Sequence, residues 1–170
     1  MTVASRPRPI GRRSHARRPR VVVAGCRGAL AATLRRAARH VLASERRTAG
    51  ELEIVVVRDA AMARLHRRWK DRAGPTDTLS FDLRDAPTDP RVCGVVVVCA
   101  DVARRVARRR GTPLAAELAL YVVHGCLHLL GYDDARPADF RRMHRREDAL
   151  LSELGFGSVF AAAAPRAGAP

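Results

Sequence analysis

The chain has 170 residues, of which 32 are lysine or arginine and 17 are aspartate or glutamate, so its formal net charge is +15. This length suits one domain with a core of its own, and no apolar run approaches the ~20 residues that cross a bilayer, so we expect no membrane partner. The positive surplus favours a polyanionic partner. A general bias toward arginine and alanine would produce the same surplus without a functional cause.

The two ends of the chain differ in composition from the middle. Residues 1–20 contain seven arginines and no acidic residue, and we expect a disordered basic arm there. Residues 161–170 contain only alanine, glycine, proline and one arginine, which is too little to bury, so we expect a disordered tail. The folded domain should therefore span residues 21–160.

Cysteine usage indicates a reducing compartment. The four cysteines form no CxxC pair and show no spacing typical of a disulfide framework, so we expect a cytoplasmic protein. The apolar run Val21–Ala24 follows the basic arm as the core of a signal peptide would. Because it is shorter than the 7–15 residues that such a core needs, we do not expect a signal peptide.

In chain order, the apolar periodicity predicts strands that alternate with helices in the first part of the chain and a series of helices at the end. Strands rich in β-branched and apolar residues are expected at Val21–Ala24, Leu52–Val57, Thr78–Leu83 and Gly94–Cys99. Helices are expected at Gly28–Leu42, at about Ala60–Trp69, after a capping Asp101, from a capping Thr112 onward, and from about Pro137 to before Gly155. This order predicts a single α/β domain in which a mixed sheet of about four strands is covered by helices.

Two histidines lie four residues apart on the fourth of these helices, which we expect to be central in the fold. His124 and His128 leave the same face, because residues i and i+4 are neighbours on an α-helix. Gly131 can end the helix in a left-handed turn, which would bring Asp134 to the same point. Two imidazoles and a carboxylate with a fourth position open are the ligands of a catalytic zinc ion. The spacing therefore predicts one zinc ion and a metal-dependent hydrolase.

Several neighbours of this motif have competing interpretations. Cys126 should point to the opposite helix face as a small buried hydrophobe. Asp133 either orients a metal ligand or forms a turn. His144 competes for the third ligand position, although it lies ten residues further on in a separate helix. Glu147 is expected to form a surface salt bridge, with the alternatives that it caps a helix or orients a ligand.

Gly125 limits the chemistry of the motif. Zinc peptidases carry the pattern H-E-x-x-H, in which a glutamate beside the first histidine is the general base. Glycine takes that position here, so a peptidase is disfavoured. A glycine inside a helix costs about 1 kcal/mol relative to alanine, which suggests that another segment approaches the backbone closely.

Three segments together resemble the YbeY family of bacterial endoribonucleases. The run His124–Asp134 is similar to the family signature H-G-x-L-H-L-x-G-Y-D-H, Thr76–Phe81 to the block T-D-V-L-S-F, and Met143–Glu147 to an M-x-x-x-E element. The resemblance covers about residues 51–154. It implies a small single α/β domain, one zinc ion, and cleavage of single-stranded RNA during ribosomal RNA maturation and ribosome assembly.

The chain departs from the family pattern at two positions. The third metal ligand of the family is histidine, and Asp134 stands there; a carboxylate oxygen is an acceptable zinc ligand but lowers the charge of the site by one. The tyrosine–arginine pair of the family becomes Trp69-Lys70, and Lys70, the only lysine in the chain, keeps the charge but not the bidentate fork. Arg68 or Arg72 could contact the phosphate instead.

The sequence thus predicts a zinc-dependent endoribonuclease that cleaves phosphodiester bonds of single-stranded RNA. The expected zinc ligands are His124, His128 and Asp134, and Lys70 is the expected catalytic cation. Its expected partners are a ribosomal RNA precursor or the ribosome, with no DNA partner. Two alternatives remain: a noncatalytic RNA- or ribosome-binding assembly factor with a structural zinc, and a zinc hydrolase of peptides or small esters.

Overall fold

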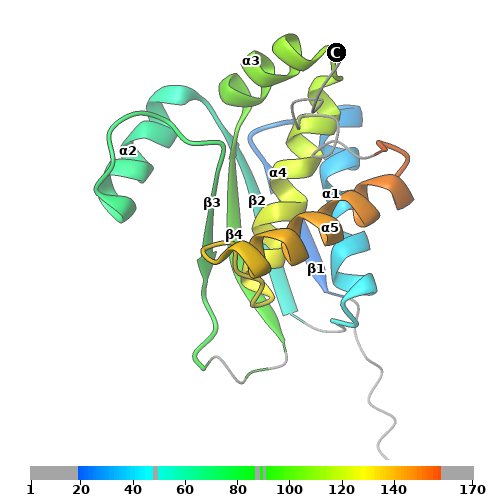
Figure 1. The fold of residues 1–170 in the computed structure, drawn as a ribbon. Helices are drawn as coiled ribbons and strands as arrows, with labels where there is room; N and C mark the ends of the chain where they lie inside the picture. The colour runs from blue at the N-terminus through cyan, green and yellow to red at the C-terminus, as the bar shows by residue number, and fades with distance from the viewer. Residues whose placement is uncertain (1–18, 48–49, 87–88, 90, 158–170) are drawn as a thin grey trace, which may run out of the picture.

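The computed structural model describes residues 19–47, 50–86, 89 and 91–157. The predicted basic arm and tail lie outside these residues, apart from positions 19 and 20. Figure 1 shows a layered α/β arrangement. In chain order the elements are β1 (Arg20–Ala24), α1 (Gly28–Ser44), β2 (Gly50–Val57), α2 (Asp59–Lys70), β3 (Thr78–Asp82), β4 (Val92–Cys99), α3 (Ala100–Arg110), α4 (Leu114–Leu129) and α5 (Pro137–Glu153).

The four strands form one mixed sheet in the order β1-β2-β4-β3. Strands β1, β2 and β4 are parallel, whereas β3 pairs antiparallel with β4 and forms an edge of the sheet. This confirms the predicted class and strand number. None of the helices in the described ranges has the length and apolar character that a membrane crossing requires.

The two faces of the sheet are covered by different helices, because side chains alternate along each strand. On β4, Val96 and Val98 belong to the main core, which also contains buried residues of α1, α4 and α5. Val97 and Cys99 point to the other face and pack with Met62 of α2. Figure 1 accordingly shows α2 apart from α1, α4 and α5.

Helix α4 is the central helix of the fold, as predicted. Of its 16 residues, 12 are buried. His124 and His128 are only partly buried, so they interrupt an otherwise enclosed helix. Cys126 is 1% exposed, and burial raises the pKa of its thiol to about 12, as expected for a residue that acts as a hydrophobe.

Two predicted helix caps are wrong. Helix α3 begins at Ala100, so Asp101 lies inside its first turn, and its carboxylate instead accepts the backbone N–H of Asp59 at the start of α2. The hydroxyl of Thr112 donates to the buried Glu117 and does not cap α4. Asp101 thus binds a distant segment of the chain, whereas Thr112 binds a side chain in the first turn of α4 instead of the backbone N–H groups that the capping rule assigns to it.

Gly125 marks a place where α4 approaches the sheet closely, as the sequence suggested. A Cβ atom at this position would lie 2.5 Å from Cγ1 of Val96 and 2.9 Å from Oγ of Ser80. The Ser80 hydroxyl also donates to the Gly125 carbonyl oxygen at 3.1 Å. The glycine therefore lets the histidine-bearing helix lie directly against β3 and β4.

We expect Gly125→Ala to destabilise the protein, although alanine is the better helix former by about 1 kcal/mol. Overpacking a tight contact costs about 1–3 kcal/mol, which should outweigh that gain. Urea unfolding measures the effect, and the same substitution in a Val96→Ala background should cost less because the nearest clashing atom is gone. A Gly125→Ala protein more stable than the parent would contradict this packing account.

Candidate metal centre

Three potential ligand atoms converge beside α4. The Nε2 atoms of His124 and His128 lie 3.0 Å apart, and Oδ2 of Asp134 lies 3.9 and 3.8 Å from them. Tetrahedral zinc with bonds of 2.0–2.2 Å requires donors about 3.3 Å apart, and the observed distances bracket that value. Among the described residues, these three side chains form the group of His, Cys, Asp or Glu residues whose ligand atoms lie close enough together, within 4.8 Å, to hold a metal ion.

The turn after α4 brings Asp134 to the histidines. Gly131 has φ +91°, which confirms the predicted left-handed turn. The N–H of Tyr132 donates to the carbonyl oxygen of Leu127, and that of Gly131 to His128, so the helix ends in a Schellman motif. The chain reverses direction there and brings the Asp134 carboxylate back to the helix face that carries His124 and His128.

Both imidazoles are oriented by a partner at Nδ1. His124 Nδ1 donates to Oε1 of Glu147 at 2.6 Å, and His128 Nδ1 donates to the carbonyl oxygen of Tyr132 at 3.0 Å. With Nδ1–H committed to these acceptors, each Nε2 carries a lone pair toward the other. Two lone pairs 3.0 Å apart repel unless a cation or a proton lies between them. The donor set therefore fits a metal ion.

The two histidines differ in their affinity for protons. Burial lowers the pKa of His124, but the hydrogen bond and charge of Glu147 outweigh it, so the net shift is upward. Burial and the neighbouring His124 lower the pKa of His128. His128 therefore stays neutral more readily, which is the state in which imidazole binds a metal.

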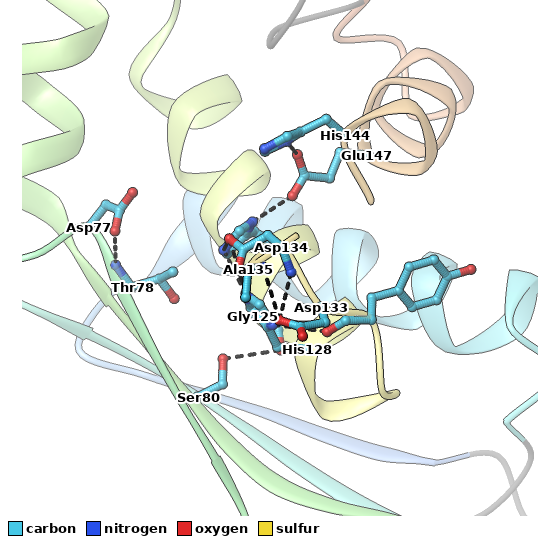
Figure 2. A network of polar contacts seen from close by, with 12 residues as sticks. Asp77, Thr78, Ser80, Gly125, His128, Asp133, Asp134, Ala135, His144 and Glu147 are labelled. Carbon is cyan, nitrogen blue, oxygen red and sulfur yellow. Dashed lines mark hydrogen bonds and ion pairs between the residues drawn. The ribbon is translucent and has the colours of Figure 1, made fainter. Parts of the chain in front are cut away.

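Glu147 is not on the surface, so the expected salt bridge there is wrong. Its side chain is fully buried, and besides His124 it accepts a hydrogen bond from Nδ1 of His144. Figure 2 shows His144 and Glu147 next to each other on α5, with the Glu147 carboxylate directed toward α4. His144 therefore contacts Glu147, while Asp134 completes the triangle with His124 and His128. Glu147 orients the His124 ring, a function that the sequence left open as a weaker alternative.

Asp133 forms the turn that carries the proposed ligand Asp134. Its Oδ1 accepts the backbone N–H groups of Asp134 and Ala135 at 2.8 and 3.2 Å, as Figure 2 shows. These hydrogen bonds lower the pKa of the Asp133 carboxyl. The contacts match the turn-forming alternative, and through them Asp133 fixes the backbone of its neighbour Asp134.

A cavity of about 350 Å³ adjoins the metal centre. His124, His144 and Glu147 are among its lining residues, and Asp77, Tyr121 and Arg110 contribute further polar groups. This volume lies in the range of small-ligand sites, so the cavity can hold part of a substrate next to the ligand atoms.

Comparison with known proteins assigns the family. Residues 26–155 match the family model described as endoribonuclease YbeY. The chain belongs to the YbeY family. A relative from Anaeromyxobacter sp., endoribonuclease YbeY, is 42% identical over 137 residues, which are 81% of this chain and 69% of that protein. The corresponding proteins of Myxococcus xanthus and Rhodococcus opacus are each 44% identical over 62% of this chain.

The chain spans only part of several YbeY relatives: 37% of the Myxococcus protein and 63% of the Rhodococcus protein. A Thermotoga maritima protein of known solution structure has a similar fold, with a TM-score of 0.58 and 23% identity. The similarity covers 80% of this chain and 88% of that protein. This similarity supports the fold alone, because 23% sequence identity is too low to carry information about the chemistry of the site.

The predicted cations lie apart from the three ligand atoms. Lys70 is the last residue of α2, Arg68 lies two residues before it, Arg72 follows in the loop, and all three are exposed. None of them lines the cavity formed by the described residues beside His124. The loop that begins with Arg72 leads to Pro75, which does line it. In this YbeY chain the three cations therefore lie outside the cavity, on the segment of the chain that precedes Pro75.

Proposed function

We propose that the protein is a zinc-dependent endoribonuclease that cleaves single-stranded RNA during ribosomal RNA maturation in the cytoplasm. The observation that carries this proposal is the set of two imidazole Nε2 atoms and a carboxylate, which meet within 4.8 Å beside a cavity. Membership of a family named for endoribonuclease activity supports the reaction class. The net charge of +15 supports a polyanionic substrate.

His124, His128 and Asp134 would hold the metal ion. A bound zinc would act as a Lewis acid on a phosphate oxygen or on water. Glu147 and the Tyr132 carbonyl keep the two Nε2 atoms aimed at one point, so the ligands need little rearrangement before binding. Asp134 brings a negative charge where the family signature has histidine, so the site prefers a dication more strongly and polarises its substrate less.

Incubation of the purified protein with labelled single-stranded RNA, with and without a chelator, tests the proposal. We expect endonucleolytic products that disappear on chelation and return when zinc is added. RNA binding without cleavage would favour the assembly factor with a structural zinc. Chelator-sensitive hydrolysis of peptides or esters, with RNA left intact, would favour the third class of function.

We further propose that Lys70 stabilises negative charge on the scissile phosphate, with Arg68 and Arg72 binding neighbouring phosphates. All three are exposed cations beside the loop that leads to the cavity. A cation in this position can bind the RNA backbone and would lie near the phosphate on which a bound metal would act.

We expect Lys70→Ala to lower kcat by about 10- to 100-fold, somewhat less than removal of a buried oxyanion donor costs, because solvent screens an exposed cation. Single-turnover cleavage at saturating RNA measures it. Arg64→Ala removes the same charge from an exposed position of α2 and should have a small effect. Equal losses in the two variants would reduce Lys70 to a general electrostatic contribution, whereas Lys70→Arg should retain activity.

A further inference from the structure

Trp69 is the only tryptophan of the chain, and its exposure is unusual. It is 57% exposed at the C-terminal end of α2. The other large exposed apolar residues among the described positions are Leu83 and Phe140. Phe140 packs against His144 with ring centroids 4.0 Å apart. An indole held mostly in water gains little from the core, and tryptophan is a residue type that is enriched at binding interfaces.

Neighbouring side chains hold the indole in place without covering it. The ring of Phe81 makes an edge-type contact with Trp69, with centroids 5.5 Å apart and an interplanar angle of 64°. The Arg68 guanidinium lies 5.7 Å from the centroid of a Trp69 ring, a distance typical of a weak cation–π contact. Because Arg68 is itself exposed, a planar ligand can displace it and leave its charge nearby.

The indole stands in a strongly basic segment. Positions 67–72 read Arg-Arg-Trp-Lys-Asp-Arg, with four cations, one acid and every residue exposed. Asp71 adopts a left-handed conformation with φ 50°, which ends the helix and turns the chain toward β3. An aromatic surface surrounded by cations has the composition of a site for single-stranded nucleic acid, in which bases stack and phosphates pair with the cations.

The edge strand connects this segment to the metal centre. On β3, Phe81 contacts Trp69, and the adjacent Ser80 donates a hydrogen bond to Gly125, the residue after His124. Since neighbouring strand residues point to opposite faces, the indole and the metal centre lie on the two sides of one edge strand. A chain of nucleotides that crosses this edge can contact both.

We propose that Trp69 is the stacking platform for an unpaired base of the RNA strand that enters the metal centre, with Arg68 and Arg72 binding the adjacent phosphates. This inference rests on the proposed function, and it gives that function a physical basis for strand selectivity. In a duplex the base faces are already covered by stacking, so only an unpaired base can be offered to the indole.

The single tryptophan reports on this contact directly. Titration of the zinc-loaded protein with a 2′-O-methyl oligonucleotide of about ten residues, checked for intactness on a gel, should quench Trp69 fluorescence. A strand of the same length that carries abasic sites keeps the phosphates and removes the bases, so it should bind without quenching. The matching duplex should quench weakly.

Matched variants separate stacking from folding. Trp69→Ala should weaken single-strand binding by roughly 5- to 150-fold, the range for loss of one stacked base, and should raise KM with little change in kcat. Trp69→Phe should restore most of the affinity. Leu83→Ala is the control, because Leu83 has the same exposed fraction of 57% and should leave affinity unchanged.

Two results would overturn the inference alone: binding of the labelled strand, seen by anisotropy, with no change in Trp69 fluorescence, or equal affinities of Trp69→Ala and Leu83→Ala. In either case chelator-sensitive RNA cleavage would still support the proposed function. Absence of both binding and cleavage would overturn the inference and the proposed function together.

Discussion

Replacing His128 with alanine is expected to abolish zinc retention and RNA cleavage together. The substitution removes one of three donors and leaves two atoms, His124 Nε2 and Asp134 Oδ2, that are 3.9 Å apart. Removing a residue that only hydrogen-bonds to a metal ligand lowers metal affinity by about 10- to 100-fold. Removing a ligand itself should therefore lower zinc affinity by more than roughly 100-fold. The imidazole is partly exposed, so the fold should survive.

Elemental analysis of the purified variant, together with its cleavage of labelled RNA, measures both effects. His40→Ala is a suitable control. His40 of α1 also pairs with a carboxylate, that of Glu153 in α5, but it is not one of the three proposed ligands. That variant should retain zinc and activity. Cleavage by a His128→Ala protein shown to contain no metal would remove the catalytic ion from the proposed function.

Replacing Glu147 with alanine should also have a large effect, because it should lower both the stability of the fold and the affinity for the metal. The change would leave the Nδ1–H groups of His124 and His144 without their acceptor in a buried setting. Breaking a buried pair of this kind costs about 3–5 kcal/mol. Zinc affinity should also fall by about 10- to 100-fold, because the His124 ring is no longer held in place. Thermal unfolding and a competitive zinc titration measure the two losses.

Glu153 provides a matched comparison for Glu147. It also accepts a histidine hydrogen bond at 2.6 Å, from His40, but its side chain is 48% exposed. We expect Glu153→Ala to cost at most about 1 kcal/mol, as exposed ion pairs do, and to leave zinc binding intact. Glu147→Gln should lie between parent and alanine, since the amide oxygen still accepts one hydrogen bond. Similar losses at positions 147 and 153 would show that burial does not give Glu147 its importance.

Local patterns predicted the elements well because each has a local cause. The β-branched run 52–57 lies inside β2, and the expected left-handed residue at Gly131 has φ +91°. The spacing of His124 and His128 was sufficient to predict that their rings share a helix face, which the structure shows. Each of these features depends on residues close in sequence, where backbone geometry leaves few choices.

Features that depend on tertiary packing could not be predicted from the sequence. Glu147 looked like a surface residue because nothing in its own helix shows that α5 lies against α4 beside His124. The same limit applies to Asp101, whose partner is the start of α2, 42 residues earlier. Gly125 is predictable in part. A glycine inside a helix indicates a close approach by another segment, but only the fold identifies Val96 and Ser80 as its neighbours.

The turn after α4 places the proposed metal ligands close together in the sequence, so metal binding should contribute little to folding. All three proposed ligands come from one segment of 11 residues, 124–134, so the chelate closes a short loop and cross-links no distant parts of the chain. Closing so short a loop removes little entropy from the unfolded chain. Apoprotein should therefore keep its native far-ultraviolet circular dichroism, unlike a domain whose fold depends on zinc. A cation bound at this site would then be available for chemistry, because the fold would not depend on it.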